Sequence, residues 1–161
     1  MQHCFPPVIR SDTRLLLLGS LPGAMSLAES RYYANPRNQF WRIVGAVIGR
    51  DLAALPYEDR LKALLEEGIG LWDTVAAATR EGSLDLAIRL HEASDLQGLA
   101  ETLPELRAVG FNGGKAAAIG RPQLAARPDL ALVDLPSSSP AFTLPFEAKL
   151  ERWMALKPHV G

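Results

Sequence analysis

The stretch Leu15-Leu16-Leu17-Leu18-Gly19-Ser20-Leu21-Pro22-Gly23 joins four leucines to a short loop of small residues and proline. A short apolar run bounded by such a loop is typical of a strand buried on both faces of a parallel sheet. Ligands of these sheets bind outside the carboxyl ends of the strands. The stretch therefore predicts a central strand whose following loop, residues 19–23, borders a ligand site.

Four apolar runs in all have the character of strands: residues 14–18, 69–72, 108–111 and 131–134. Helical patterns occur at residues 38–48, 58–66, 94–103, 114–119 and 147–156. The third of these helices opens with Ser94-Asp95-Leu96-Gln97, which resembles a capping box begun by Ser94. Strands that alternate with helices predict a parallel sheet covered on both faces. We expect an α/β fold with three layers, α/β/α, a four-stranded parallel sheet and a single domain over residues 1–161.

Composition narrows the class of protein. The single cysteine, Cys4, excludes an internal disulfide framework and a cysteine-cluster metal site. The three histidines (His3, His91 and His159) are far apart and lack metal-ligand spacing, so neither a metal nor another cofactor is expected. The first residues lack a signal-peptide pattern, and no apolar run approaches the roughly 20 residues of a membrane span. These features predict a soluble, cytoplasmic protein with no membrane partner.

The net charge of −1 argues against a protein that coats nucleic acid through many lysine and arginine contacts. Residues 31–42 nevertheless carry Arg31, Arg37 and Arg42 without an acid, interleaved with aromatic residues. Two interpretations remain open for this segment. It is either a local basic face that engages a nucleotide or a helix end with solvated arginines beside core aromatics.

Small or polar residues follow each predicted strand, at residues 19–23, 73–74, 112–115 and 136–140. Because parallel strands end at the same edge of a sheet, we expect these loops to form one composite site. No dinucleotide fingerprint, P-loop or Gly-x-Ser-x-Gly nucleophile elbow is present. A phosphate-binding loop is favoured at the serines of residues 137–139, with a plain turn as the alternative. Asp73 and Asn38 also have a local alternative, since both residue types cap helices.

Taken together, these segments resemble the uracil-DNA glycosylase superfamily, and most closely its hypoxanthine-DNA glycosylase branch, family 6. The matching blocks occur in the family's order: GSLPG at 19–23, SL at 26–27, YYANPRNQFW at 32–41, LWDTV at 71–75, GSLD at 82–85, FNG at 111–113 and LPSSSPA at 135–141. The resemblance implies a uracil-DNA glycosylase-like fold and a nucleotide that is flipped out of the DNA stack. It also implies hydrolysis of the N-glycosidic bond to leave an abasic site.

The resemblance implies a catalytic residue outside the first loop. Leu21 stands where many members of the superfamily carry an aspartate or asparagine, and leucine cannot polarise water. In this branch the implied residue is Asn38, whose amide orients water or stabilises positive charge on the sugar. Asn35 is the second choice, since Pro36 follows it. Phe40 resembles the aromatic that stacks on the flipped base, with a core position as the alternative.

Two further differences concern base recognition. Asp73 aligns with an asparagine that reads uracil in other branches, and an ionised carboxylate there accepts the N1–H of hypoxanthine or xanthine but not adenine. Leu135 replaces a common histidine of the second motif, so that donor to a uracil carbonyl is missing.

The resemblance also implies which residues contact the base and the DNA. The implied base-binding residues are Gly19, Ser20, Leu21, Pro22, Phe40, Asp73 and Asn112. The implied DNA-binding residues are Ser26, Arg37, Lys115, Ser137, Ser138 and Ser139, with Phe142 or Leu144 as a wedge.

The leading hypothesis is a monofunctional, monomeric DNA glycosylase in base excision repair that acts on DNA containing a deaminated purine. The first alternative is a uracil or thymine mismatch glycosylase on the same fold. The second alternative is a non-catalytic nucleic-acid-binding module. No lysine is placed as an evident Schiff-base nucleophile, so strand cleavage by the enzyme itself is not expected.

Overall fold

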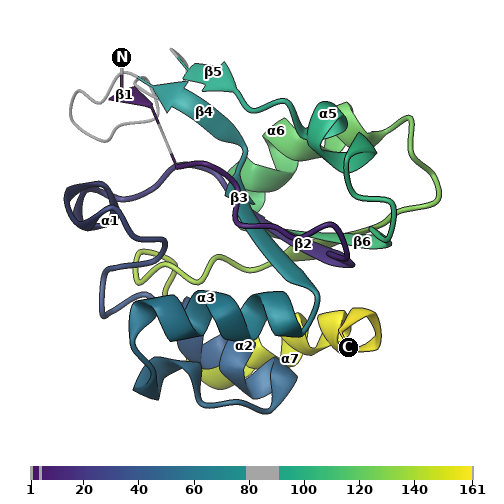
Figure 1. The fold of residues 1–161 in the computed structure, drawn as a ribbon. Helices are drawn as coiled ribbons and strands as arrows, with labels where there is room; N and C mark the ends of the chain where they lie inside the picture. Colours follow the sequence, from purple (N-terminus) through teal and green to yellow (C-terminus); the bar gives the residue numbers. More distant parts are fainter. Residues whose placement is uncertain (1, 4, 79–90, 161) are drawn as a thin grey trace.

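The computed structural model describes residues 2–3, 5–78 and 91–160. Cys4 and the block at residues 82–85 lie outside the described residues. Within the described part, no helix is both long enough and apolar enough to cross a membrane. The fold is built around one parallel sheet (Figure 1).

This sheet has four parallel strands in the order β3-β2-β6-β7. The strands are β2 (Leu15–Gly19), β3 (Ile69–Asp73), β6 (Ala108–Asn112) and β7 (Ala131–Leu135). The four leucines of β2 are each at most 1% exposed, because β2 is an inner strand covered on both faces. The predicted four-stranded parallel sheet is therefore confirmed.

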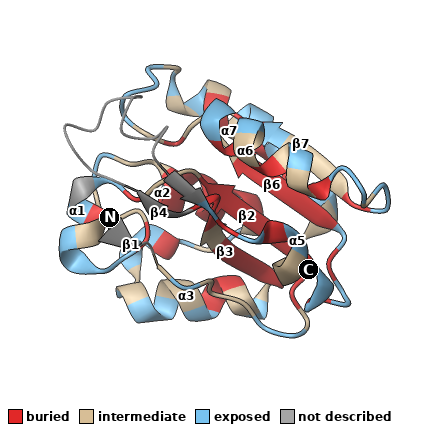
Figure 2. Ribbon diagram, turned by 90° about the horizontal axis from the view of Figure 1, so that it is seen from above, coloured by how far each residue is buried: buried red, intermediate tan, exposed pale blue. Residues whose placement is uncertain are grey.

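Helices cover both faces of the sheet, as predicted (Figure 1). Leu15 and Leu17 pack on the side of α2 (Phe40–Ile48), α3 (Tyr57–Glu66) and α7 (Phe146–Trp153). Leu16 and Leu18 pack on the side of α5 (Leu96–Glu101) and α6 (Gly114–Leu124). Successive side chains of a strand point to opposite faces, so one run of leucines contributes to two cores. Figure 2 shows the resulting buried centre between exposed outer helix faces.

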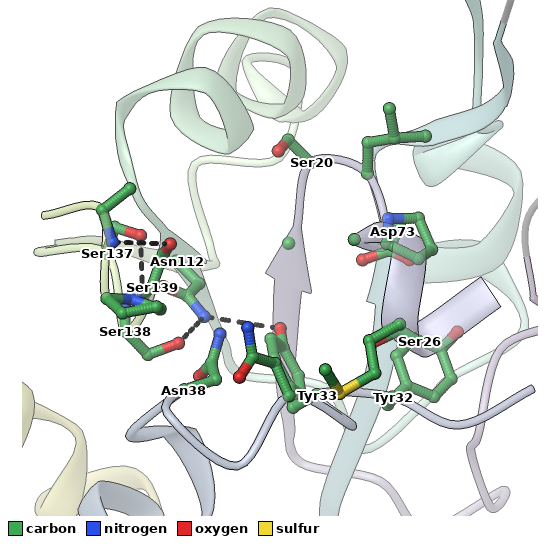
Figure 3. Close-up of a pocket in the computed structure, with 18 residues that line it drawn as sticks. Ser20, Ser26, Tyr32, Tyr33, Asn38, Asp73, Asn112, Ser137, Ser138 and Ser139 are labelled. Carbon is green, nitrogen blue, oxygen red and sulfur yellow. Dashed lines mark hydrogen bonds between the residues drawn. The ribbon is translucent and has the colours of Figure 1, made fainter. Parts of the chain in front are cut away.

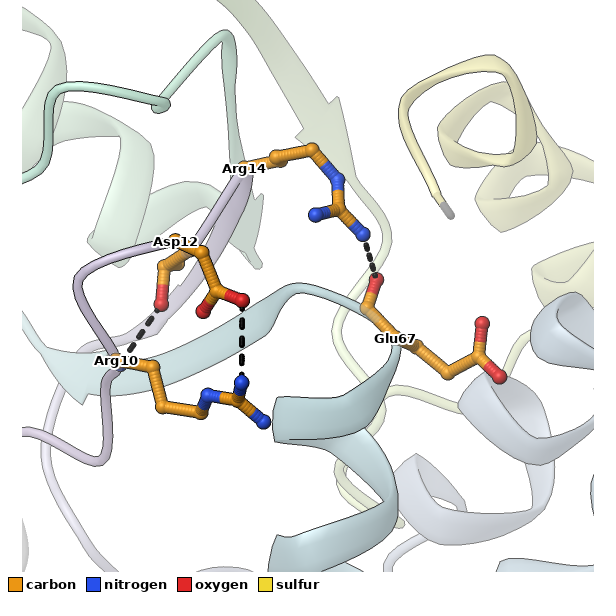
Figure 4. Close-up of polar contacts among 5 residues, drawn as sticks. Arg10, Asp12, Arg14 and Glu67 are labelled. Atoms are coloured by element: carbon orange, nitrogen blue, oxygen red, sulfur yellow. Dashed lines mark hydrogen bonds and ion pairs between the residues drawn. The ribbon is translucent and has the colours of Figure 1, made fainter.

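The start of β2 is fixed beside the end of α3 by polar contacts (Figure 4). The backbone N–H of Arg14 and the backbone N–H of Leu15 both donate to the carbonyl oxygen of Gly68, at 2.8 and 3.0 Å. The Arg14 guanidinium donates to the Glu67 carbonyl oxygen at 3.3 Å. The nearby Arg10–Asp12 ion pair is exposed and adds little stability. With its start held in this way, β2 pairs in register with β3 up to Gly19 and Asp73.

Several elements differ from the sequence predictions. A second, antiparallel sheet of β1 (Gln2–His3), β4 (Val75–Ala78) and β5 (His91–Ala93) was not predicted, nor was α1 (Ala24–Glu29). Two 3₁₀ helices, η1 (Leu52–Ala54) and η2 (Met154–His159), were also missed as such. Asp95, not Ser94, caps α5, because the Asp95 side chain accepts from the Gly98 N–H. The Ser94 hydroxyl instead donates to the Asp73 carbonyl oxygen at 2.6 Å.

Candidate active site

The loops at the carboxyl edge of the parallel sheet surround one cavity of about 340 Å³ (Figure 3). Most of the side chains singled out from the sequence line it. They are Gly19, Ser20, Leu21, Pro22, Ser26, Asn38, Asp73, Asn112, Ser137, Ser138 and Ser139. Phe40, Arg37 and Lys115 do not line this cavity. The volume is within the range of about 300–1,000 Å³ that is common for small-ligand sites.

The first loop is held against the end of β3 by backbone hydrogen bonds. The Thr74 N–H donates to the Gly19 carbonyl oxygen at 2.7 Å, and the Val75 N–H donates to the Ser20 carbonyl oxygen at 3.0 Å. A Cβ atom on Gly19 would lie 2.7 Å from Asp73 Oδ1 and 3.1 Å from Tyr33 Oη. Glycine is therefore needed at residue 19, because it lets two polar side chains approach the backbone at the end of β2.

Asp73 is a buried carboxyl group at the wall of this cavity. The residue is 4% exposed, and its Oδ2 atom has no hydrogen-bond partner among the described residues. Burial raises the pKa of Asp73 to about 7, because a low-polarity environment disfavours the charged form. The sequence interpretation assumed an ionised carboxylate. With a pKa of about 7, the protonated, neutral form of Asp73 is also populated at neutral pH.

Asn38 lies across the cavity from Asp73 (Figure 3). The side-chain oxygen of Asn38 accepts from the Phe40 N–H at 2.9 Å, so Asn38 contributes to the start of α2. This contact leaves a second lone pair of Oδ1 and the donors of Nδ2 for a ligand. Asn35 lines the same cavity, and its side-chain oxygen accepts from the Arg37 N–H at 2.9 Å. Both asparagines considered as the catalytic residue therefore line the cavity.

Asn112 connects three segments around the cavity. Its Nδ2 donates to Ser138 Oγ at 2.9 Å and, over a longer 3.4 Å, to Tyr33 Oη. Its Oδ1 accepts from the Ser138 N–H at 2.9 Å. The Ser138 carbonyl oxygen in turn accepts from the Gln39 N–H at 3.0 Å. The network positions the serine loop against the start of α2, and it uses atoms of Asn112 and Ser138 that the sequence assigned to base and DNA contacts.

The other two serines of the loop are more accessible. Ser137 Oγ accepts from the Ser139 N–H at 3.1 Å, and Ser139 Oγ accepts from the Ala141 N–H at 3.2 Å. As acceptors, both hydroxyls keep their own protons for donation to a phosphate oxygen. Behind the loop, the buried Lys149 ammonium donates to the Ser139 carbonyl oxygen at 3.1 Å. Burial lowers the pKa of Lys149.

Two aromatic residues line the cavity, Tyr32 and Tyr33, and sequence reasoning selected neither as a site residue. Phe40 is fully buried, and the ring of Tyr33 stacks on it with centroids 3.8 Å apart and an interplanar angle of 13°. Phe40 therefore packs as core, the alternative kept open from its helical spacing. Tyr33 has a φ of +53°, which is uncommon for a residue with a side chain, and its carbonyl oxygen accepts from Trp41 Nε1 at 3.2 Å. Tyr32 is 4% exposed and its hydroxyl donates to the Pro6 carbonyl oxygen at 2.9 Å, whereas Tyr33 is the ring stacked on Phe40.

Of the remaining predicted residues, only Ser26 lines the cavity. Ser26 is buried, and its Oγ accepts from the Ala34 N–H at 3.0 Å, which closes the loop between α1 and α2. Arg37 and Lys115 are exposed, Lys115 in the first turn of α6. Phe142 is 45% exposed beyond the serine loop, and Leu144 is half-buried.

Polar and apolar residues both line the cavity. Within the described part of the chain, no lysine, arginine or histidine is among its lining residues. Leu135, which replaces a histidine in the resemblance, is 4% exposed and packs in the core. Histidine, cysteine, aspartate and glutamate form no group of three or more suited to a metal ion among the described residues. The arrangement suits an uncharged planar ligand with carbonyl and N–H groups.

The fold and this site define a class of protein. The family model of the uracil DNA glycosylase superfamily matches residues 6–157, and the chain belongs to that superfamily.

Particular relatives support the same branch as the sequence motifs. The chain is 48% identical over 112 residues to a hypoxanthine DNA glycosylase of Methanosarcina acetivorans, and 46% identical over 112 residues to one of Methanosarcina barkeri. Each match covers 70% of this chain and 71% of the relative. The solution NMR structure of a uracil DNA glycosylase candidate from M. acetivorans superimposes with a TM-score of 0.88 at 41% identity. That match covers 98% of this chain and 97% of the other, and it confirms the predicted fold class.

Proposed function

We propose that this chain is a monofunctional DNA glycosylase that removes hypoxanthine, and also xanthine, from DNA by hydrolysing the N-glycosidic bond. The observation that carries the proposal is the meeting of Asn38, Asp73 and Tyr33 at one cavity of about 340 Å³. The relatives also support the proposal, because both are named hypoxanthine DNA glycosylase. The proposal includes a single glycosylase domain over residues 1–161 that acts as a monomer on DNA in the cytoplasm.

The base enters the cavity because the glycosidic bond is poorly accessible in stacked DNA. Extrusion costs a few kcal/mol, and least for a mispaired base such as hypoxanthine. In this proposal the ring of Tyr33 contacts the face of the base, supported from behind by Phe40. Ser137 and Ser139 hold the phosphates that flank the extruded nucleotide. Phe142 fills the space that the nucleotide leaves in the DNA.

Asn38 has the central role in hydrolysis. By analogy with sugar hydrolysis, the transition state has oxocarbenium character, so the attacking water does not need a strong base. The Asn38 amide is suited to orient this water, because one lone pair of Oδ1 remains after its contact with Phe40 N–H. The Phe40 N–H also fixes the rotamer of Asn38, which reduces the cost of ordering it in the reaction.

The testing experiment measures base release from labelled duplexes that carry one hypoxanthine, xanthine or uracil, followed by cleavage of abasic sites with alkali. We expect hypoxanthine release under single-turnover conditions and a loss of at least about 100-fold in Asn38→Ala. Asn35→Ala is the matched comparison, since Asn35 lines the same cavity but contacts Arg37. Asp134→Asn, at an exposed carboxyl on β7, controls for general effects of substitution.

Each alternative has its own outcome. Preferential release of uracil identifies a uracil or mismatch glycosylase and contradicts the proposal. Retained binding without release of any of the three bases indicates a binding module. Equal losses in Asn38→Ala and Asn35→Ala would contradict the central role of Asn38 without contradicting glycosylase activity.

A further inference from the structure

None of the described residues that line the cavity is a cationic partner for the departing base. When the glycosidic bond breaks, its electron pair stays with the base and the negative charge spreads to the ring carbonyl oxygen. Histidine is the donor expected from the resemblance, but Leu135 occupies that position and is buried in the core. No lysine, arginine or histidine of the described part lines the cavity. Stabilisation of the base therefore depends on an uncharged donor.

Asp73 is placed to supply that donor. It is 4% exposed and lines the cavity, and its buried Oδ2 has no hydrogen-bond partner in the part of the chain that the structure describes. Gly19 has no side chain that would displace it, since a Cβ there would lie 2.7 Å from Asp73 Oδ1. A buried polar atom without a partner is costly, and a ligand that completes its hydrogen bonding removes that cost.

The surroundings favour the uncharged form of Asp73. The loop at residues 19–23 and the end of β6 bring no titratable side chain to it, and the serine loop at residues 137–139 brings only hydroxyls. The one titratable group that faces it among the described residues is Tyr33, from the loop before α2. Burial and the charge of Asp73 both raise the pKa of Tyr33, so the phenol stays neutral. Burial, with no cation to oppose it, raises the pKa of Asp73 to about 7.

We propose that Asp73 acts as an uncharged acid, whose O–H donates a hydrogen bond to the carbonyl oxygen of the departing base in place of the absent histidine. This inference rests on the proposed function. In the reaction, the bond between N9 and C1′ breaks and its electron pair stays on the purine, whose O6 accepts the Asp73 hydrogen bond. The water oxygen bonds to C1′, and the proton that this water loses neutralises the released purine.

The same contact makes Asp73 a specificity residue. Hypoxanthine and xanthine present a carbonyl oxygen at C6, which accepts from the neutral acid. Adenine presents an amino group there, so two donors face each other and one loses its partner. A carboxylate that accepts N1–H, as interpreted from the sequence, gives a similar preference but the opposite dependence on pH. The pH dependence therefore separates the two roles.

The experiment is the single-turnover rate of hypoxanthine release between pH 5 and 9 for wild type, Asp73→Asn and Asp73→Ala. The wild-type rate is expected to fall about tenfold per pH unit above about pH 7, as the donor ionises. Asp73→Asn keeps an N–H donor at every pH, so it retains activity and loses this fall. Asp73→Ala is expected to lose about 100-fold or more at every pH. Asp134→Asn should follow wild type throughout.

A wild-type rate that rises from pH 6 to 8 would overturn the inference, as would an unchanged fall in Asp73→Asn. Absence of hypoxanthine release at every pH contradicts the proposed function instead. The ¹³C carboxyl signal of Asp73, identified by its loss in Asp73→Asn, then decides the inference without substrate. A titration midpoint near 7 supports the neutral acid, and a midpoint below about 5 excludes it.

Discussion

Asp73 affects stability as well as chemistry, because its carboxyl group is buried and Oδ2 has no hydrogen-bond partner among the described residues. In the unfolded chain its pKa is near the ordinary value of about 3.9. The folded state raises this pKa to about 7, so it binds the proton more tightly than the unfolded state does. The contribution of Asp73 to the free energy of unfolding is therefore fully present below about pH 4, and it is lost progressively as the pH rises to about 7. A site suited to a neutral acid thus lowers the stability of the free protein at neutral pH.

We predict that wild type loses roughly 2–3 kcal/mol of unfolding free energy relative to Asp73→Asn between pH 5 and pH 8. The amide does not titrate, so its own stability lacks this component. Urea unfolding of both proteins at the two pH values measures the difference. A gap between the two proteins that is the same at pH 5 and pH 8 would contradict a raised Asp73 pKa.

Tyr33 and Phe40 differ in their predicted effects although their rings are stacked. Tyr33→Ala removes the ring at the cavity and should weaken substrate binding, seen as a higher KM for hypoxanthine DNA, while Tyr33→Phe keeps most of the ring contact. Phe40→Ala should cost about 3–5 kcal/mol of stability, because Phe40 is fully buried. Kinetics and urea unfolding of all three variants separate the roles. Equal losses of stability in Tyr33→Ala and Phe40→Ala would count against this assignment.

At the scale of elements, the site is assembled by contacts between strand ends and loops that are distant in sequence. Ser138, on the loop after β7, is 1% exposed and bonds to Asn112 at the end of β6 and to Gln39 before α2. Gly113 has a φ of +96°, and a Cβ there would lie 3.3 Å from the Ser137 Cβ. Glycine at this position lets the β6 and β7 loops approach each other.

We predict that Ser138→Ala costs about 1–3 kcal/mol of stability, because it removes the buried acceptor of Asn112 Nδ2. Asn112 Oδ1 still accepts from the Ser138 backbone N–H, but Nδ2 keeps only its longer contact with Tyr33 Oη, so Tyr33 is held less firmly and the single-turnover rate should fall as well. Ser137→Ala is the matched comparison, since Ser137 is only half-buried and accepts a local hydrogen bond from the Ser139 N–H. Thermal unfolding and single-turnover rates test both effects. Equal changes of stability and rate in Ser138→Ala and Ser137→Ala would show that Ser138 has no specific role in holding the β6 and β7 loops together.

For the whole molecule, charge sets the expected mode of DNA binding. The net charge is −1, and in the described part no cation lines the cavity. Positive charge near the site is local, with Arg31 and Arg37 exposed on the segment that leads into α2 and Arg42 exposed within α2. Affinity for undamaged DNA should therefore be weak, and recognition should depend on the extruded base.

We predict a shallow salt dependence of binding to undamaged duplex, with a slope of log K against log salt of about −2 to −4. Each phosphate contact contributes about −0.9, and few contacts are expected because no described residue that lines the cavity is a cation. Arg37→Ala should reduce the slope by about one contact. Fluorescence anisotropy over a salt series measures both. A slope steeper than about −7 would reveal an extended basic interface and contradict this local mode of binding.

The sequence by itself determined the layers of the molecule and the edge of the sheet where the site lies. Strand length, helical periodicity and the run of leucines at residues 15–18 are local signals, and they predicted the four parallel strands and the helices on both faces. The position of the loops followed, because parallel strands end at one edge. The motifs then indicated the family, which the superfamily match confirmed.

Only the tertiary structure decided which side chains reach the cavity and in what state. Tyr33 rather than Phe40 faces it, Asn112 and Ser138 bond to each other, and Asp73 is buried without a cation. Each of these features depends on residues 26 to 79 positions apart, as in the 3.4 Å contact of Asn112 with Tyr33, or on burial by several elements at once. Residue type and spacing specify the backbone pattern, whereas burial and charge state arise only when distant segments pack together.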